Sequence, residues 1–581
     1  MISRSTAPLA TVLIALLGAS SFVLPISSFA EQRPNVLFIS VDDLNDWIGC
    51  LGGHPQTVTP NFDRLAASGT LFTNAYCAAP ACNPSRSAIL SGIPPHRSGL
   101  YRNEQVLRDV LPEAVLMPRY FSDHGYWSAG SGKLLHYIID ARSWDDYFPE
   151  KEKEDPFPRT FYPKKRPVNL PVGGPWQYVE TDWAALDVTD EEYGGDWSVT
   201  KWIGEQLTRE QEKPFFLACG IYRPHEPWFV PAKYFEPFPL ESIQLPRGYR
   251  EDDLDNLPPS GQKMGPNRYF DHIQKQGQWK KGIQAYLASI HFADAMLGRV
   301  LDALENGPHN DNTIVVLWSD HGWHLGEKQH WQKFTGWRVC DRVPLMLRVP
   351  KGAPGLPDGT AAGSICERTV NLVDLYSTLV ELCGLPAKEG ISNTSLVPLL
   401  RNPKAEWEHA AITQINDAES YAISTERWRL IHYSNGDEEL YDIEADPHEW
   451  TNLVHGSVAS DHQAKAAELR ALGPKDAVPM PEVAVSRRPE LPWHPASDGA
   501  APASKPDGNP FAVAFINQRE DAVELMWMDR EGNPKSYGTI EATKSKPMQT
   551  HPGAVWMIRD GNGSVLGHFV VGDRAARAVI P

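Results

Sequence analysis

Four apolar segments of this chain each end in a short group of polar and charged residues. The pairs are 35–41 with Asp42-Asp43, 126–130 with Gly132-Lys133-Leu134-Leu135-His136, 214–220 with Tyr222-Arg223-Pro224-His225, and 313–318 with Ser319-Asp320-His321-Gly322. Nearly continuous apolar runs are typical of strands that are buried on both faces. Because ligands bind at the carboxyl edge of an open α/β sheet, we expect these four polar groups to meet in one functional site.

Amphipathic segments between the strands predict the helices that cover this sheet. Apolar residues recur at helical spacing in 281–306 and 372–382, and Gly384 and Pro386 stop the second segment. Strands that alternate with helices indicate a mostly parallel sheet with helices on both faces. The sequence therefore predicts an α/β fold, and 581 residues are too many for one ordinary core.

The segment Cys82-Asn83-Pro84-Ser85-Arg86-Ser87-Ala88-Ile89-Leu90-Ser91-Gly92 predicts a helix that begins beside a cysteine. Pro84 suits the first turn of a helix, where its missing N–H would have had no partner. A helix N-terminus favours a bound oxyanion because it carries partial positive charge and unpaired N–H groups. Arg86 adds a fixed cation to the same place.

This segment resembles the C-x-P-S-R-x-x-x-L-T/S-G signature of type I sulfatases, with Ser91 at the T/S position. The resemblance implies that a formylglycine-generating or sulfatase-maturating enzyme oxidises Cys82 to formylglycine, an aldehyde. One hydroxyl of the hydrated aldehyde attacks sulfur, and the other expels sulfate as the aldehyde re-forms. The resemblance covers about residues 33–454, looks most like the iduronate-2-sulfatase branch, and implies an alkaline-phosphatase-like fold.

The resemblance also implies a metal site built from Asp42, Asp43, Asp320, His321 and the formylglycine derived from Cys82. Hard oxygen donors suit Ca²⁺ or Mg²⁺ better than Zn²⁺, and Ca²⁺ is the usual ion in the family. Many sulfatases carry Asn at the position of His321, whereas the iduronate-2-sulfatase branch carries His. His324, Glu327 and His330 could be taken for a second metal site, but their spacing is loose for zinc and no cysteine pair supports it.

The same resemblance gives roles to charged residues that follow the other strands. Lys133 would bind formylglycine and sulfate, and His136 would accept a proton as a general base. His225 would bind sulfate and could protonate the leaving alcohol. Arg86 would hold the formylglycine, and Lys333 would contact the leaving-group side of sulfate. We expect sugar contacts from residues close to these in sequence, namely Arg223, Trp337 and Arg338. Packing in the core is the alternative for the tryptophan.

The composition limits the ligands that the chain can take. A formal net charge of −18 argues against a protein that binds nucleic acid or an anionic membrane. A sulfate ester is itself anionic, so cations inside the site must outweigh the field of the whole chain. The resemblance implies hydrolysis of a sulfate monoester on an oligo- or polysaccharide, and the branch suggests 2-O-sulfate on or near a uronic acid.

Residues 1–30 predict a cleavable signal peptide. Arg4 precedes the apolar run 9–26, and the small residues Ser28 and Ala30 mark a cleavage site. A signal anchor is the alternative. No later run is apolar enough to span a bilayer, so we expect a periplasmic or secreted protein. Six cysteines remain beside Cys82, and their spacing dictates no disulfide.

We expect a catalytic domain at 31–405, a subdomain with a small sheet and a helix at 406–471, and a Pro/Ala/Ser-rich linker at 472–509. Residues 510–581 have the strand pattern of a β-sandwich and resemble the β domain of the von Hippel–Lindau tumour suppressor. The residues at or near the hydroxyproline pocket of that family would be Trp527, Tyr537, Thr550 and Trp556. Ala554 stands where the pocket histidine is expected, so we favour a module that packs or binds glycan or peptide.

Two other functions fit parts of this pattern. A phosphatase or phosphonate hydrolase on the same scaffold would tend to use an unmodified Thr or Ser, or more metal ligands. A non-catalytic protein that captures sulfated glycans would be supported by loss of a metal aspartate, and Asp42, Asp43 and Asp320 are all present.

Overall fold

The computed structural model of this chain describes Met1 and residues 33–163, 166–174, 177, 180–391, 393–455, 459–481, 485–506, 511–572 and 575–581. The predicted signal peptide at 1–30 lies outside the described residues. None of the helices in the described part of the chain has the length and apolar character needed to cross a membrane.

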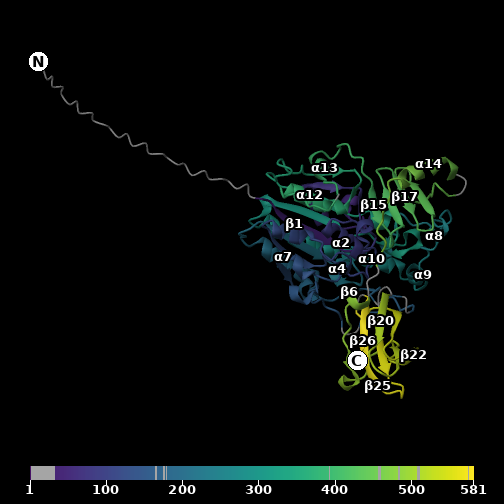
Figure 1. Cartoon of the computed structure of the whole chain (residues 1–581). Helices are drawn as coiled ribbons and strands as arrows, with labels where there is room; N and C mark the ends of the chain where they lie inside the picture. Colours follow the sequence, from purple (N-terminus) through teal and green to yellow (C-terminus); the bar gives the residue numbers. More distant parts are fainter. Residues whose placement is uncertain are drawn as a thin grey trace. The chain divides into compact units, whose positions relative to one another are not determined.

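An eight-stranded sheet forms the centre of the largest part of the chain (Figure 1). In order across the sheet, its strands are β13 (Ser364–Cys366), β2 (Thr70–Phe72), β12 (Leu345–Arg348), β9 (Thr313–Ser319), β1 (Asn35–Val41), β7 (Phe215–Ile221), β4 (Trp127–Gly132) and β5 (Asp146–Phe148). β1 pairs in parallel with β7 and β9, and β4 pairs in parallel with β7 and β5. Only β12 runs antiparallel to its neighbours β9 and β2 among the described strands of this sheet. The expected mostly parallel sheet is therefore confirmed.

Helices cover both faces of this sheet. The side chains of Leu37, Ile39 and Val41 on β1 pack into one core, and those of Val36 and Phe38 pack into the other. The first core contains α1 (Pro60–Ser68), α7 (Asp196–Leu207) and α10 (Trp279–Glu305). The second contains α5 (Met117–Asp123), α12 (Leu375–Leu382) and α13 (Val397–Arg401). The continuous apolar run of β1 is thus explained, because every one of its side chains is buried.

The strand register brings the four polar groups to one edge of the sheet. Val41 at the end of β1 pairs with Ile221 on β7 and with Ser319 on β9, while Gly132 on β4 pairs with Gly220. The residues that follow these strands therefore lie side by side. α2 (Cys82–Ser91) begins at the same edge, and all ten of its residues are buried.

Two further β units complete the described chain. An antiparallel sheet consists of β15 (Ala411–Gln414), β16 (Tyr421–Ser424), β17 (Trp428–His432) and β18 (Glu438–Asp442), and it is followed by α14 (Ala459–Arg470). The C-terminal sandwich has one sheet of β19 (His494–Pro495), β25 (Val565–Val570), β24 (Val555–Arg559), β21 (Val523–Met528) and β22 (Pro534–Ile540). Its other sheet has β23 (Ser545–Thr550), β20 (Phe511–Asn517) and β26 (Ala576–Ile580), of which β20 and β26 are parallel.

Part of the stretch that composition predicts as a linker belongs to this sandwich. β19 pairs with β25, and Leu491 is buried in the sandwich core. A strand as short as β19 has too few residues to show a hydrophobic pattern. The Pro/Ala/Ser-rich composition around it therefore indicated a linker.

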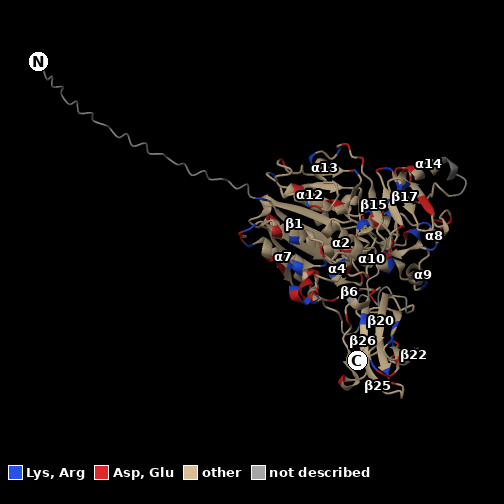
Figure 2. Cartoon of the chain, viewed as in Figure 1, with Lys and Arg blue, Asp and Glu red and all other residues tan. Residues whose placement is uncertain are grey.

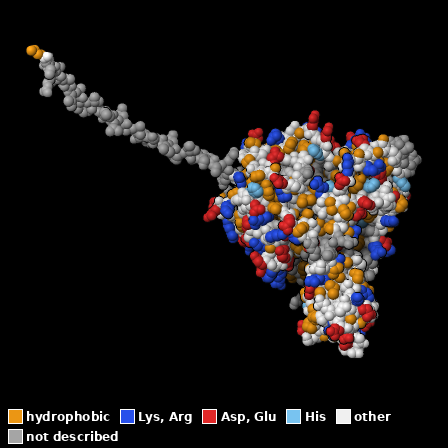
Figure 3. Space-filling view, viewed as in Figure 1, with side chains coloured by type: hydrophobic (Ala, Val, Ile, Leu, Met, Phe, Trp, Pro, Cys, Tyr) orange, Lys and Arg blue, Asp and Glu red, His pale blue; other side chains and the backbone are white. Residues whose placement is uncertain are grey.

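Acidic and basic side chains share the surface. Figure 2 shows Lys and Arg interspersed with Asp and Glu over the outer helices and loops. On the face shown in Figure 3, hydrophobic side chains are scattered among charged ones. Arg86, Lys133 and Lys333, in contrast, are buried.

Candidate active site

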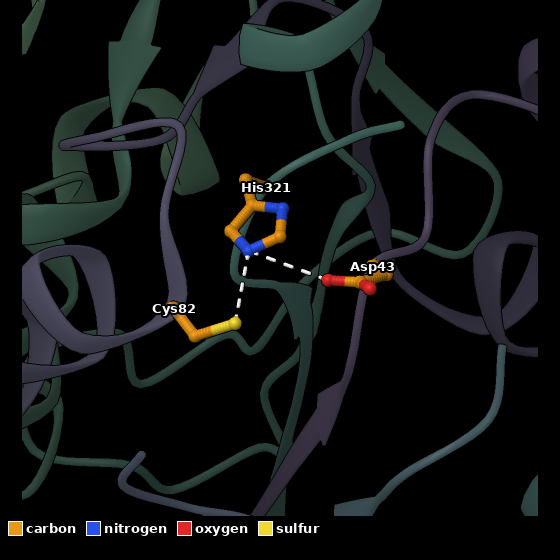
Figure 4. A group of neighbouring side chains, drawn as sticks. All are labelled: Asp43, Cys82 and His321. Atoms are coloured by element: carbon orange, nitrogen blue, oxygen red, sulfur yellow. Dashed lines mark hydrogen bonds and ion pairs between the residues drawn. The ribbon is translucent and has the colours of Figure 1, made fainter. Parts of the chain in front are cut away.

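Cys82 lies at the first position of α2 and is fully buried. Its Sγ is 3.1 Å from Lys333 Nζ, 3.3 Å from His321 Nε2 and 3.6 Å from Lys133 Nζ. Figure 4 shows the His321 ring between Cys82 and Asp43. Burial raises the pKa of the Cys82 thiol, but Lys133 and Lys333 outweigh burial and hold this pKa well below its usual range. The surroundings therefore favour an anion at position 82.

Three buried carboxylates surround this sulfur, and each pairs with a buried cation. Asp42 accepts hydrogen bonds from Lys133 Nζ at 2.5 Å and from an Arg86 terminal nitrogen at 2.9 Å. Arg86 Nε donates to Asp320 at 2.7 Å, and Lys333 Nζ donates to Asp43 at 2.7 Å. Burial raises the pKa of Asp42, but Lys133 and Arg86 outweigh burial and keep it well below its usual range. The arrangement is a balanced set of charges held away from water.

The ligand atoms fit a hard divalent cation. Oxygen, nitrogen and sulfur atoms lie within 4.8 Å of one another in each of three overlapping groups: Asp43, Cys82 and His321; Asp42, Cys82 and Asp320; and Asp42, Asp43 and His225. His321 Nδ1 lies 3.0 Å from the carbonyl oxygen of Gly322, to which it donates its proton in the neutral ring. The lone pair of His321 Nε2 is then directed toward Cys82 and Asp43. Asp43 Oδ2 is buried without a hydrogen-bond partner among the described residues.

The charges around His321 also favour a cation beside Cys82. Burial lowers the pKa of His321, but Asp320 and Cys82 together outweigh burial and raise this pKa to about 9. Burial raises the pKa of Asp43 to about 7, against the attraction of Lys333. A divalent cation bound at this place would keep Asp43 ionised and His321 neutral, which are the forms that bind a metal.

Two further histidines face the group. His225 Nδ1 lies 2.7 Å from the carbonyl oxygen of Glu226, and its Nε2 lies 3.7 Å from Asp43 Oδ2. Burial, then Lys133, hold the pKa of His225 well below its usual range. Burial also lowers the pKa of His136, although a hydrogen bond with Cys82 opposes that effect. Both imidazoles are therefore neutral at pH 7 in this structure.

The structure thus brings together ten of the residues selected from the sequence, namely Asp42, Asp43, Cys82, Arg86, Lys133, His136, His225, Asp320, His321 and Lys333. The three expected sugar contacts make hydrogen bonds to other residues of the chain. Arg223 is buried and donates to the hydroxyl of Tyr193 and to the carbonyl oxygen of His225, at 2.7 and 2.8 Å. Trp337 donates to Glu439 at 2.9 Å, and the backbone N–H of Arg338 donates to Glu449 at 2.7 Å. Arg223 therefore supports His225, whereas Trp337 and Arg338 contact the small antiparallel sheet and the segment after it.

The alternative zinc residues are occupied by other contacts. His324 Nε2 lies 2.6 Å from the Thr335 hydroxyl, and His330 Nδ1 lies 2.7 Å from the carbonyl oxygen of Met264. These imidazoles hold the loop that carries Lys333.

Sequence reasoning missed two tyrosines. The Lys133 ammonium lies over the rings of Tyr137 and Tyr222, at 4.9 and 5.3 Å from their centroids. The Tyr222 ring also stacks on His225, with centroids 4.7 Å apart. Both tyrosines directly follow a strand-end group or lie within one, and this position was the available signal. Such contacts restrict where Lys133 and His225 can point.

Comparisons with known proteins agree with this geometry. The family profile described as "Sulfatase" matches residues 34–385, "N-sulphoglucosamine sulphohydrolase, C-terminal" matches 326–471, and "VHL beta domain" matches 504–566. A "Sulfatase" of Formosa agariphila is 38% identical over 454 residues, which cover 76% of this chain and 87% of that protein. The "Iduronate 2-sulfatase" of Homo sapiens is 30% identical over 396 residues, covering 60% of this chain and 69% of that protein.

Solved structures show the same alkaline-phosphatase-like fold. BT4656, in complex with its substrate D-glucosamine-2-N,6-O-disulfate, matches with a TM-score of 0.57 and 24% identity, covering 76% of this chain and 97% of that one. The phosphonate monoester hydrolase of Agrobacterium radiobacter matches with a TM-score of 0.58 and 24% identity, covering 76% of this chain and 96% of that one.

Proposed function

The chain belongs to the sulfatase family, and on this premise we propose that it hydrolyses a sulfate monoester of a sulfated carbohydrate by means of a formylglycine made from Cys82 and one divalent ion. The relatives support the carbohydrate part, since one acts on iduronate 2-sulfate by its name and another was solved with a glucosamine disulfate. Within this class we propose 2-O-sulfate on or near a uronic acid.

The observation that carries the proposal is the charge balance around Cys82. Three buried carboxylates, Asp42, Asp43 and Asp320, face three buried cations, Arg86, Lys133 and Lys333. A divalent ion would add two positive charges. A sulfate monoester and an ionised hydroxyl at position 82 would add one negative charge each, so the buried total would stay at zero.

Asp42, Asp43, Asp320 and His321 would hold the ion, together with the group at position 82. We propose Ca²⁺, with Mg²⁺ as the alternative, because three of the four side chains are carboxylates. When bound, the ion would polarise a sulfate oxygen and stabilise charge that develops on it.

The other side chains would bind the anion and move protons. Formylglycine supplies an aldehyde that takes up water to form a nucleophilic hydroxyl. Lys133 and Lys333, both within 3.6 Å of Sγ, would bind sulfate oxygens. His136 would accept the proton released at position 82. His225 holds one proton toward Glu226, so a second proton on Nε2 would be the one given to the leaving alcohol.

The wider assignments follow the same proposal. We propose that residues 1–30 direct export to the periplasm or the medium, and that an enzyme of the formylglycine-generating type acts on the chain. We also propose a catalytic domain at 31–405, a subdomain at 406–471 and, after a Pro/Ala/Ser-rich segment that begins at 472, a last module that binds glycan or peptide and includes β19.

Mass spectrometry of the tryptic peptide 65–86 tests the proposal, on protein from its native source or made together with a maturation enzyme. Fragmentation must separate position 82 from Cys77, which lies in the same peptide. An aldehyde at position 82 is the expected result, and an intact thiol despite an active maturation enzyme would contradict it. Turnover of an aryl phosphate in preference to an aryl sulfate would favour the phosphonate hydrolase alternative, which has a similar fold.

A further inference from the structure

A cavity of about 420 Å³ lies beside the active site. We call it the tyrosine pocket. Its described lining comprises Gly132, Tyr137, Asp155, Phe157, Pro158, Arg159, Thr160, Tyr162, Glu180, Tyr193, Gly195, Asp196, Val199, Gly220, Tyr222 and Arg223. A cavity of this volume is large enough for a small ligand such as a sugar unit.

Tyr137 and Tyr222 separate the tyrosine pocket from the active site. They line the pocket, and the Lys133 ammonium lies over both of their rings. Their hydroxyl groups are 3.2 Å apart, so the two side chains form one wall. Because Lys133 Nζ is also 3.6 Å from Cys82 Sγ, a ligand in the pocket would be a close neighbour of the reacting sulfate.

Aromatic rings and a fixed backbone shape the pocket. Phe157 packs against Tyr137 and Tyr222, with ring centroids 5.3 and 5.2 Å apart and planes at 62° and 73°. The segment that carries Phe157 is held by Gly195 N–H, which donates to the Arg159 carbonyl at 3.1 Å. Rings in such a wall offer flat apolar faces to a ligand.

The charges of the pocket do not favour an anion. Inside, Asp196 accepts the backbone N–H groups of Tyr222 and Arg223 at 2.7 and 2.9 Å, and Arg223 is occupied as described above. At the mouth, the side chains of Asp155 and Arg159 are exposed, and Glu180 is partly buried. The described lining thus carries three carboxylates and two guanidinium groups. The pocket thus has one carboxylate more than it has cations, whereas the carboxylates and the Lys and Arg side chains around Cys82 are equal in number.

We propose that the tyrosine pocket binds a neutral pyranose ring, the sugar unit next to the one that carries the sulfate. This inference rests on the proposed function for the sulfated carbohydrate. The C–H face of the ring would lie on Phe157. Its hydroxyl groups would hydrogen-bond to Asp155, Arg159 and Glu180, because carboxylates accept and guanidinium groups donate. A uronate or a second sulfate in the pocket would meet like charge at the mouth.

Saturation-transfer NMR on the full chain tests this inference, with N-acetylglucosamine and glucuronate as separate probes. N-acetylglucosamine should receive saturation from the protein, and glucuronate should bind about tenfold more weakly. Phe157→Ala should weaken N-acetylglucosamine binding about tenfold through loss of the apolar face. Arg159→Gln changes an exposed side chain and should weaken the same signal without affecting the fold. The matched control is Arg119→Gln on α5, an exposed residue paired with Asp123.

Each outcome decides the inference. Glucuronate binding that is as tight as that of N-acetylglucosamine and is lost in Phe157→Ala, no binding of N-acetylglucosamine, or an N-acetylglucosamine signal that survives both pocket variants would overturn it. Hydrolysis of 4-nitrophenyl sulfate by the matured chain reports separately on the proposed function. Selective sugar binding without any sulfate release would contradict the proposed function and leave the pocket assignment in place.

Discussion

Two groups of buried side chains in this protein both pair carboxylates with cations, but the two groups differ in how their members are arranged. One surrounds Cys82, and the other surrounds Arg429 on β17. Arg429 is fully buried and lies 3.0 Å from Asp341 and 2.8 Å from Glu449. It also donates to the Ser424 hydroxyl at 2.9 Å and to the carbonyl oxygen of Gly336.

The Arg429 group joins two parts of the chain. Gly336 and Asp341 belong to the loop that brings His321 and Lys333 into the active site, and Arg429 belongs to the small antiparallel sheet. Its charges face one another across this junction. In the group at Cys82, by contrast, ligand atoms from separate strand ends converge on one sulfur. Both groups are therefore buried and charged. The group at Cys82 differs because its side chains are directed at one atom, as a reactive site requires.

Replacing Cys82 by alanine is expected to have the largest effect on activity. Cys82→Ala removes the only source of the proposed nucleophile, so turnover of an aryl sulfate should fall by at least about a thousandfold. Urea denaturation should show a folded protein, because Lys133 and Lys333 keep their ion pairs with Asp42 and Asp43 when the sulfur is removed. Cys366→Ala, at another buried cysteine, is the control and should retain turnover. Appreciable hydrolysis by Cys82→Ala would rule out the formylglycine mechanism.

Removing the cation of the other group should instead reduce stability. Arg429→Met leaves Asp341 and Glu449 buried without their partner, which should lower the free energy of unfolding by about 3–5 kcal/mol. Arg427→Met, two residues away on the surface, should change it little. Urea denaturation of both variants gives the comparison. Equal stability of the two would mean that the Arg429 group is not the structural junction described here.

Two matched carboxylate variants separate metal binding from stability. Asp320→Asn removes a proposed ligand charge and should weaken metal binding about tenfold to a hundredfold. Asp341→Asn, in the Arg429 group, should leave metal affinity nearly unchanged and lower stability. Calorimetric titration of each metal-free variant with Ca²⁺ measures both affinities. If calcium affinity is the same in Asp320→Asn and the parent chain, the proposed ligand set is wrong.

The smallest effect is expected from removal of residues after Pro481. The contacts described for the two charge groups involve no residue beyond Glu449. Hydrolysis of a small aryl sulfate by the shortened chain should therefore stay within about twofold of the full chain, an effect of less than about 0.5 kcal/mol. A complete loss would show that the last module completes the active site.

The strands and their polar ends could be predicted because the information is local. An apolar run such as that of β1 fixes a buried strand, and parallel pairing places the next residues at the same edge. The contacts that Trp337 and Arg338 make could not be predicted, because closeness in sequence to Lys333 was the guide used for them. Their direction depends instead on Glu439 and Glu449, which lie about a hundred residues away in the chain. The roles of Tyr137 and Tyr222 were also not predicted. Their contacts with the Lys133 ammonium cannot be recognised from the pattern of apolar residues in the sequence.

The burial of α2 has a consequence for the order of events during biosynthesis. Every residue from Cys82 to Ser91 is enclosed by the rest of the folded chain. An enzyme that made the proposed formylglycine would therefore have to bind this segment while it is still extended, before the sheet and helices close around it. The time available is set by the folding rate of the chain, and export as an unfolded polypeptide would lengthen it. A molecule that folds too early would keep its thiol until it next unfolds.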